Sequence, residues 1–471
     1  MAAAAAALGL LAVHAAISGC DHDEVEHLHA AWLVAQGEAP FRDFLEQHHP
    51  AVFYVLAPLA RALDGSPRAL IFAARSLDLL LLVAALVVFL RLARPLLRDA
   101  GALWPPLLLL GSFFFARNSM EVRPDPWMSL LCLAALWQWA AYLREGGLRR
   151  AAAAGLCLGL AIFFLQKAVA FAGLLALGTV PVVAGRGERL GGALRGGAVL
   201  AAAVLAPLAA MVVAVRGAGL WQDFFFWNYT FNRFYYLETH FEGPSALAIV
   251  GVSIAESPLL WVGGLAGLWM ALRRFAELPE HPELALSATV VVGILASVLR
   301  SRWPFSHNLL LMQPALAVLA VHAIETVQAP RWRTALSVLL LSLVAKGGVL
   351  CFTYDEGHGN VRIEERILAA TGPGDRVAAA PPYNPIFRRD SFFFWYVPVN
   401  NAQAYLDCCR RHGCPPGKVD RDRRAWLTDP PALVYLPADE PSWAPVDFDA
   451  HRAEYRETDV PGLLARRAGL R

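Results

Sequence analysis

Apolar runs long enough to cross a lipid bilayer recur along most of this 471-residue chain. The hydrocarbon core of a bilayer is about 30 Å thick, so a helix needs about 20 residues to cross it. Charged residues make up only 17% of the chain, whereas soluble domains carry roughly 25%. The sequence therefore predicts an all-α polytopic membrane protein. Its eleven expected membrane helices lie at residues 2–19, 68–92, 103–117, 126–143, 150–165, 168–184, 197–216, 245–272, 284–299, 305–324 and 333–352.

Arginine gathers in the short loops at every second connection between these helices. Cytoplasmic loops carry an excess of positive charge, so these loops are expected on the inside. The composition, rich in Ala, Arg, Gly and Pro but poor in Lys, suggests a bacterial chain and hence the inner membrane. Most of the polar residues that could carry chemistry lie in the other segments, which predicts an active site on the outer, periplasmic side. These outward segments are 20–67, 118–125, 217–244, 300–306 and 353–471.

The N-terminal apolar run at residues 2–19 allows two interpretations. The residues Ile17-Ser18-Gly19-Cys20 resemble a lipoprotein cleavage box, but no Lys or Arg precedes the run as in a signal peptide. A retained first membrane helix is the favoured interpretation. Both interpretations place residue 21 onward outside the cytoplasm.

Residues 353–471 differ in kind from the rest, because they are Pro-rich, charged and without a spanning segment. We expect two domains: a transmembrane domain at 1–352, which includes the outer loop 20–67, and a small extracytoplasmic α/β domain at 353–471. Its expected elements are helices at Ile363–Ala370 and Ala402–Arg411 and strands at Arg376–Ala380 and Ala432–Leu436. In an oxidising compartment, one disulfide from Cys408 or Cys409 to Cys414 is favoured over a metal site.

The first outward loop opens with an acidic segment that runs into an amphipathic helix, expected at 24–36 in the membrane interface. Asp23 followed three residues later by Glu26 matches a capping box, which stabilises a helix start by about 1 kcal/mol. The same Asp23 could instead serve as a base. The two roles are compatible, since a helix start holds a carboxylate in position.

The loop continues to Glu46-Gln47-His48-His49-Pro50. Two histidines beside a carboxylate could indicate a metal site. Adjacent side chains diverge, however, so a phosphate contact or an interfacial hydrogen bond is favoured for His48 and His49. No metal site is predicted.

Asp125 lies in the short loop ahead of the fourth helix, where Pro124 precedes it and a helix cap is one possible role. A short loop also holds Asp125 at the membrane surface, within reach of the first loop. Two carboxylates from separate loops could then share the roles of base and orienting group. Cations are expected at the same surface, namely Arg123, Lys167, Arg302 and His307, although Lys167 could simply extend to the interface.

These features together resemble the type C glycosyltransferases. The matching features are Asp23-Glu24 directly after the first membrane helix, an interfacial helix, Gly37, and the Glu46–Pro50 run before an apolar segment. Arg123-Pro124-Asp125 opening the fourth helix and Arg302–His307 before a Pro-containing late helix also fit. The resemblance covers about residues 1–325. It is greatest to the protein O-mannosyltransferases and the aminoarabinose transferases, in their bacterial small-domain branch.

The resemblance implies roles for individual residues. Asp23 is the expected base and Asp125 the second acidic position. The lipid phosphate is expected to bind His48 or His49, and also Lys167 and Arg302. Aminoarabinose transferases have a Lys after the Glu of the first loop, where this chain has Gln47. Glu24, Glu46, Arg123 and His307 are expected to support the site.

The predicted function is transfer of a sugar from a polyprenyl-phosphate donor to an acceptor hydroxyl, by a single inverting displacement. The acceptor could be a lipid, a glycan or a protein, and membrane lipid is a further expected partner. No cofactor is required, although a divalent metal is possible, and the net charge of +2 is too small to indicate nucleic acid. A lipid-linked-sugar flippase and a non-catalytic assembly protein are the alternatives. The flippase would need ionisable residues in mid-membrane, where Glu256 is the main candidate.

Overall fold

The computed structural model describes most of the chain and divides it into two compact units. One unit comprises residues 1–17, 75–211 and 241–354, and the other 18–74, 212–240 and 355–471. The division therefore groups the first outer loop with the C-terminal residues, while the domain boundary expected at 352 stays a prediction. The described residues are 2–99, 102–185, 190–238, 243–327, 330–353, 360–379, 381–395, 408–413, 418–437, 445 and 447–467.

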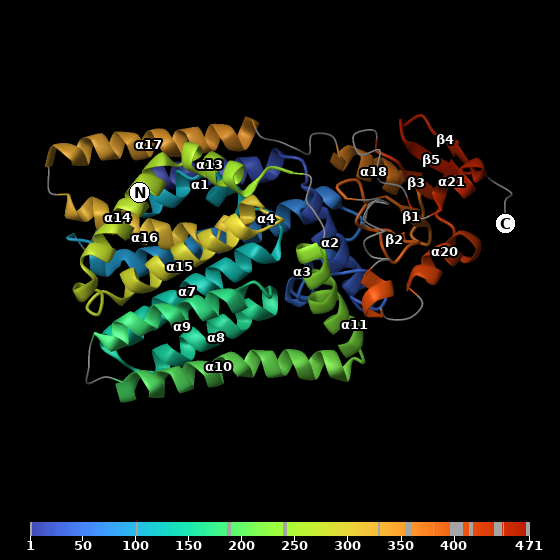
Figure 1. The fold of residues 1–471 in the computed structure, drawn as a ribbon. Helices are drawn as coiled ribbons and strands as arrows, with labels where there is room; N and C mark the ends of the chain where they lie inside the picture. The colour runs from blue at the N-terminus through green and yellow to red at the C-terminus, as the bar shows by residue number, and fades with distance from the viewer. Residues whose placement is uncertain are drawn as a thin grey trace. The chain divides into compact units, whose positions relative to one another are not determined.

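The described residues of the first unit form helices joined by loops (Figure 1). A helix lies in every one of the eleven ranges expected from the apolar runs, because a helix satisfies the backbone hydrogen bonds of an apolar segment internally. The number of membrane crossings stays a prediction. The helices are α1 (Ala2–Ile17), α4 (Pro67–Ala93), α5 (Pro106–Leu110), α6 (Phe113–Asn118), α7 (Pro124–Glu145), α8 (Leu148–Phe164), α9 (Ala168–Ala184), α10 (Leu190–Gly217), α13 (Ala246–Glu256), α14 (Pro258–Arg273), α15 (Pro282–Arg300), α16 (Gln313–Thr326) and α17 (Pro330–Thr353).

Several of these helices are suited to lipid. Among the described residues, three helices are long and apolar enough to cross a membrane, or up to five if each of two bent helix pairs is one span. Leu205 and Val213 of α10 are 62% and 70% exposed, an arrangement that is costly in water and favourable against acyl chains. The chain is a membrane protein.

Two of the predicted helices are broken. The run at 103–117 divides into α5 and α6 at Gly111, and the run at 245–272 bends by 103° at Ser257, between α13 and α14. Pro258 lacks an amide hydrogen, so α14 begins there without losing a hydrogen bond. The buried Glu256 accepts hydrogen bonds from Ser112 Oγ at 2.9 Å and from the Phe113 amide at 2.7 Å. The Glu256 carboxylate therefore accepts hydrogen bonds from donors at the start of α6.

Helices of the first unit pack closely through small residues. Helices α7, α8 and α9 lie side by side, and α15 packs against α9 and α16 (Figure 1). A Cβ on Gly155 or Gly159 of α8 would overlap backbone oxygens of α10, at Leu200 and Val204 respectively. The glycines allow the two backbones this close approach, as in other membrane helix pairs.

The second unit combines helices with a small sheet. Strand order is β2-β1-β3-β5-β4, with β1 parallel to β2 and β3 and with β5 antiparallel to β3 and β4 (Figure 1). The helix expected at 363–370 and the strands expected at 376–380 and 432–436 are present as α18, β1 and β3. The helix expected at 402–411 and Cys414 fall largely or wholly outside the described residues, and the disulfide stays a prediction. The strands are β1 (Arg376–Ala378), β2 (Arg389–Asp390), β3 (Leu433–Tyr435), β4 (Tyr455–Glu457) and β5 (Leu463–Arg466).

The helical part of the second unit includes the helices of the first outer loop. Its helices include α2 (His22–Ala35), α3 (Ala51–Ala62), α11 (Trp221–Phe225), the π-helix η2 (Phe226–Phe231), α12 (Asn232–Glu238), α18 (Asn360–Ala370), α20 (Lys418–Thr428) and α21 (Phe448–His451). Trp227 and Phe231 of η2 are fully buried, and Trp227 packs against Phe393 and Phe394. This aromatic stretch is therefore part of the core of the second unit.

Candidate functional site

The start of helix α2 carries the predicted base, and its cap differs from the expected one. Asp21 is the N-cap: its Oδ1 accepts the Asp23 amide at 3.0 Å, and Glu24 Oε2 accepts the Asp21 amide at 3.0 Å. The predicted Asp23–Glu26 capping box is therefore wrong, and the helix begins at His22 instead of residue 24. Both pairs have the same spacing of an acid three residues before a glutamate, so the pattern alone could not select one. The Asp23 side chain is not used as the cap.

The Glu46–Pro50 run forms a loop whose side chains have separate partners within the second unit. Glu46 is fully buried, and its Oε1 accepts hydrogen bonds from the Gln47 and His48 amides at 2.8 and 2.9 Å. His48 Nδ1 lies 2.8 Å from the same oxygen. His49 is fully buried too, and its Nε2 lies 3.0 Å from the Tyr229 hydroxyl. The neighbouring histidines thus contact different groups.

Asp125 lies in the first unit, in the first turn of α7. Arg123 occupies the cap position of α7 without a side-chain cap, so the predicted capping role of Asp125 is wrong. Asp125 is 3% exposed, and its carboxylate lies 3.3 Å from Lys167 Nζ and 3.6 Å from Arg123 Nε. Two cations therefore contact this carboxylate. Lys167 forms an ion pair with Asp125 and does not simply extend to the interface.

The loop before Asp125 continues this charge network within the first unit. Glu121 lies 3.0 Å from Arg117 Nε and 3.5 Å from an Arg123 Nη. Arg123 thus contacts both carboxylates of the loop. Alternating opposite charges at these distances keep the side chains in fixed positions with little net charge.

The last predicted cations lie between α15 and α16 of the first unit. Arg302 is exposed, and His307 is half-buried with its ring stacked on Phe305 at 5.0 Å. Ser306 Oγ contacts Asn118 Oδ1 at 3.5 Å, which joins this segment to the end of α6. The segment therefore packs beside the residues that precede Asp125.

Sequence reasoning missed several polar side chains in the second unit. His29 is fully buried on α2, and its Nε2 lies 2.5 Å from Asp390 Oδ2. Glu26 and His27 are also buried on α2 and lie close to Glu46 and His48. The signal was present in the density of acids and histidines along 21–29. Their partners come from up to 361 residues away, which no local pattern reveals.

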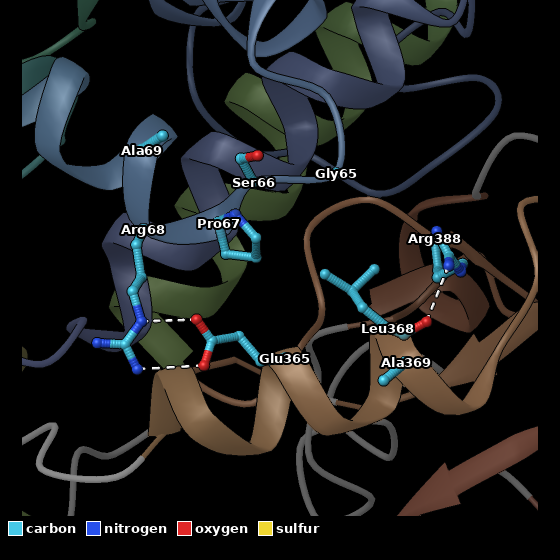
Figure 2. A pocket seen from close by; sticks show the side chains of 9 residues that line it. All are labelled: Gly65, Ser66, Pro67, Arg68, Ala69, Glu365, Leu368, Ala369 and Arg388. Atoms are coloured by element: carbon cyan, nitrogen blue, oxygen red, sulfur yellow. Dashed lines mark hydrogen bonds and ion pairs between the residues drawn. The ribbon is translucent and has the colours of Figure 1, made fainter.

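A pocket of about 590 Å³ opens within the second unit (Figure 2). A bidentate ion pair closes one side of it, with Arg68 Nε 2.6 Å from Glu365 Oε1 and Arg68 Nη2 3.1 Å from Glu365 Oε2. Arg388 lies at the opposite end, where it donates to the Leu368 carbonyl at 3.1 Å. None of the predicted site residues lines this pocket. Its lining residues are Gly65, Ser66, Pro67, Arg68, Ala69, Glu365, Leu368, Ala369 and Arg388.

Comparison with known proteins relates the fold to membrane transferases. The crystal structure of the aminoarabinose transferase ArnT from Cupriavidus metallidurans bound to undecaprenyl phosphate matches with a TM-score of 0.70 at 15% identity. The match covers 99% of this chain and 98% of ArnT. This chain has the type C glycosyltransferase fold. The apo structure of ArnT matches with a TM-score of 0.65 at 17% identity, over 93% of this chain and 92% of ArnT.

The predicted resemblance to type C glycosyltransferases is therefore confirmed at the level of the fold. The oligosaccharyltransferase AglB of Archaeoglobus fulgidus is also similar, with a TM-score of 0.48, 14% identity, and coverage of 76% of this chain and 57% of AglB. No family model and no curated protein matches the sequence. The likeness of the fold to ArnT is thus recognisable in three dimensions at 15% sequence identity.

Proposed function

We propose that this chain is an integral membrane glycosyltransferase that moves a sugar from a polyprenyl-phosphate donor to an acceptor hydroxyl. The observation that carries the proposal is the fold, shared over nearly the full length of both chains with ArnT, whose structure contains undecaprenyl phosphate. The reaction takes place on the outer face of a bacterial inner membrane. The arginine-rich loops on the other side support this orientation.

Asp23 is the proposed base. A hydroxyl is a weak nucleophile, and a positioned carboxylate that takes its proton accelerates the attack by about 10²–10⁴-fold. The hydroxyl oxygen bonds to the anomeric carbon while the bond to the lipid phosphate breaks, so the configuration inverts in one step. The rigid cap by Asp21 and Glu24 supports this role, because it fixes the backbone on both sides of Asp23.

Cations stabilise the departing lipid phosphate in this proposal. Negative charge grows on the phosphate as the bond breaks, and fixed positive groups in a partly dry site favour that charge. The residues proposed for this role are Lys167, Arg302, and His48 or His49. Asp125, held by Lys167 and Arg123, orients the acceptor.

Replacement of the proposed base gives a direct test. Asp23→Asn keeps the size of the side chain but removes its ability to take a proton, so transfer from a radiolabelled polyprenyl-phosphate sugar should fall by about 10²-fold or more. Asp43→Asn is the matched control, since Asp43 lies in the same loop and accepts the Ala39 amide, which an asparagine oxygen also accepts. Membrane insertion of both variants is confirmed by fractionation.

Wild-type transfer by Asp23→Asn would remove Asp23 from the role of base. Loss of transfer in both variants would instead indicate damage to the loop. The flippase alternative receives less support, because Glu256, its main candidate, is occupied at the start of α6.

A further inference from the structure

Four side chains of the second unit meet at one point: Glu26 and His27 from α2, and Glu46 and His48 from the following loop. Each offers one ligand atom, and these four atoms lie within 4.8 Å of one another. Glu26, His27 and Glu46 are at most 4% exposed, whereas the His48 side chain is 21% exposed. The cluster is therefore nearly closed, with one histidine open to solvent.

The distances within the cluster are short. His48 Nδ1 lies 2.8 Å from Glu46 Oε1 and 3.9 Å from Glu26 Oε1. The rings of His27 and His48 meet edge to face, with 5.1 Å between their centroids. Two imidazoles and two carboxylates thus converge from two segments that are about 20 residues apart in the chain.

The two carboxylate oxygens of Glu46 differ in their hydrogen bonds. Its Oε1 is used by the amides of Gln47 and His48 and by the His48 ring. Its Oε2 is buried and has no hydrogen-bond partner among the residues that the structure describes. A buried carboxylate oxygen without a partner is costly, by about 1–3 kcal/mol or more. A cation beside Oε2 would remove that cost.

We propose that Glu26, His27, Glu46 and His48 bind one divalent first-row cation, of the Zn²⁺ type. Imidazole nitrogen with carboxylate oxygen is a ligand set that suits zinc, whereas magnesium and calcium prefer oxygen ligands alone. Two carboxylates neutralise the charge of the ion and the histidines bind in their neutral form. Burial of a charged ion is costly unless its charge is compensated, and here the two carboxylates compensate it.

Binding requires a small adjustment of the cluster. Zinc ligands lie about 2.1 Å from the ion, so the atoms of a tetrahedral site are about 3.4 Å apart. The wider pairs of ligand atoms, now within 4.8 Å of one another, close by roughly an ångström. His48 Nδ1 and Glu46 Oε1, now 2.8 Å apart, move slightly apart. The half-open position of His48 on its loop allows this movement more readily than the helix does.

The ion would join the loop to α2 one turn beyond Asp23. Glu26 also lies within 4.8 Å of the ligand atoms of His22 and Asp23. The cation site itself does not depend on the proposed function. Under that function, however, His48 becomes a neutral ligand of the ion, and the phosphate contact expected of His48 or His49 falls to His49.

The test uses the full chain, purified in detergent without a polyhistidine tag and stripped of metal with a chelator. Titration with Co²⁺ should produce the visible absorption of a four-coordinate ion at one equivalent per chain, and Zn²⁺ should displace it. His48→Gln and Glu46→Gln should each weaken Zn²⁺ binding by at least about 10–100-fold, the loss typical of removing even an outer-shell partner. His49→Gln is the matched control and should bind as the wild type does.

Size-exclusion chromatography and circular dichroism establish that each variant is folded. If one ligand variant fails to fold, the other decides the outcome. Absence of stoichiometric Co²⁺ absorption in the wild type, or unchanged Zn²⁺ affinity in a folded ligand variant, would overturn the site and leave a metal-free hydrogen-bond network. Sugar transfer is measured separately, so an inactive chain that binds zinc contradicts only the proposed function.

Discussion

Lys167 and Asp125 form an ion pair whose two members have very different exposure. The Lys167 side chain is 39% exposed and that of Asp125 only 4%. The lysine therefore presents charge to solvent or to a ligand while its partner keeps it in place. An arrangement of this kind is suited to binding an anion from the open side.

Removal of the Lys167 charge should weaken binding of the lipid donor. Lys167→Gln should raise the KM for the lipid donor by about 10–100-fold, because hydrogen bonds to charged groups contribute about 1.5–3 kcal/mol. The turnover number should fall less than it does in Asp23→Asn. Donor titration with both variants measures the difference. Arg149→Gln, an exposed position in a predicted inward loop, should leave KM unchanged.

Asp422 leads to a prediction about pH. Burial raises the pKa of Asp422 to about 7 from 3.8, although the amides of Phe393 and Phe394 donate to its carboxylate and oppose the rise. Between these pH values the folded chain keeps the proton that the unfolded chain has lost. Stability therefore decreases as pH rises from about 4 to 7, by up to about 1.4 kcal/mol per pH unit, and is constant above that range.

Hydrogen exchange in α20 measures this effect. After correction for the intrinsic exchange rate, protection of residues 418–428 should be higher at pH 5 than at pH 8. Asp422→Asn, which resembles the neutral carboxyl group, should remove the difference. Equal protection of the wild type at both pH values would show that Asp422 ionises without cost.

Helix pairing in the first unit depends on close backbone contacts. A Cβ on Gly267 of α14 would overlap the carbonyl of Leu319 in α16, whereas a Cβ on Gly251 of α13 meets nothing within 4 Å. Gly267→Ala should therefore separate α14 from α16 and destabilise the protein by about 1–3 kcal/mol. Gly251→Ala should leave stability the same or raise it, since alanine favours a helix. Thermal unfolding in detergent compares the two variants.

The positions of the helices could be predicted from the sequence, because an apolar run of membrane length has few other stable conformations. The ends of the helices and the breaks within them could not be predicted. Asp21–Glu24 and Asp23–Glu26 match the same capping pattern, and the choice between them depends on about 1 kcal/mol. The break at Ser257 is marked by Pro258, but the partner of Glu256 lies 144 residues away.

The candidate site was predictable only in part. Asp23, Asp125 and Lys167 could be selected from loop position and resemblance. The ion pair of Lys167 with Asp125 could not be predicted, since the two residues are 42 positions apart, one just before α9 and the other in α7. The convergence of Glu26 and His27 on Glu46 was also hidden, because the amphipathic helix and the loop that follows it meet only after folding.

At the scale of the whole molecule, the charge pattern predicts the orientation in the membrane. Green fluorescent protein fused after Gly146, in an arginine-rich loop, should fluoresce, because it folds in the cytoplasm. Alkaline phosphatase fused after Gly219 should be active, because that enzyme needs the outer compartment. The opposite pair of results would place the loop with Asp23 inside and contradict the proposed reaction on the outer face.

The capping arrangement at the start of α2 affects how a mutational screen of this protein is interpreted. Asp21 and Glu24 hold the first turn of the helix through their side chains. Alanine at either position would loosen the turn that carries Asp23, and a screen of turnover alone would then report three essential acids in a row of four residues. The melting temperatures of the variants distinguish the capping acids from the base. Loss of Asp21 or Glu24 lowers the melting temperature together with turnover. Loss of the proton acceptor Asp23 lowers turnover alone.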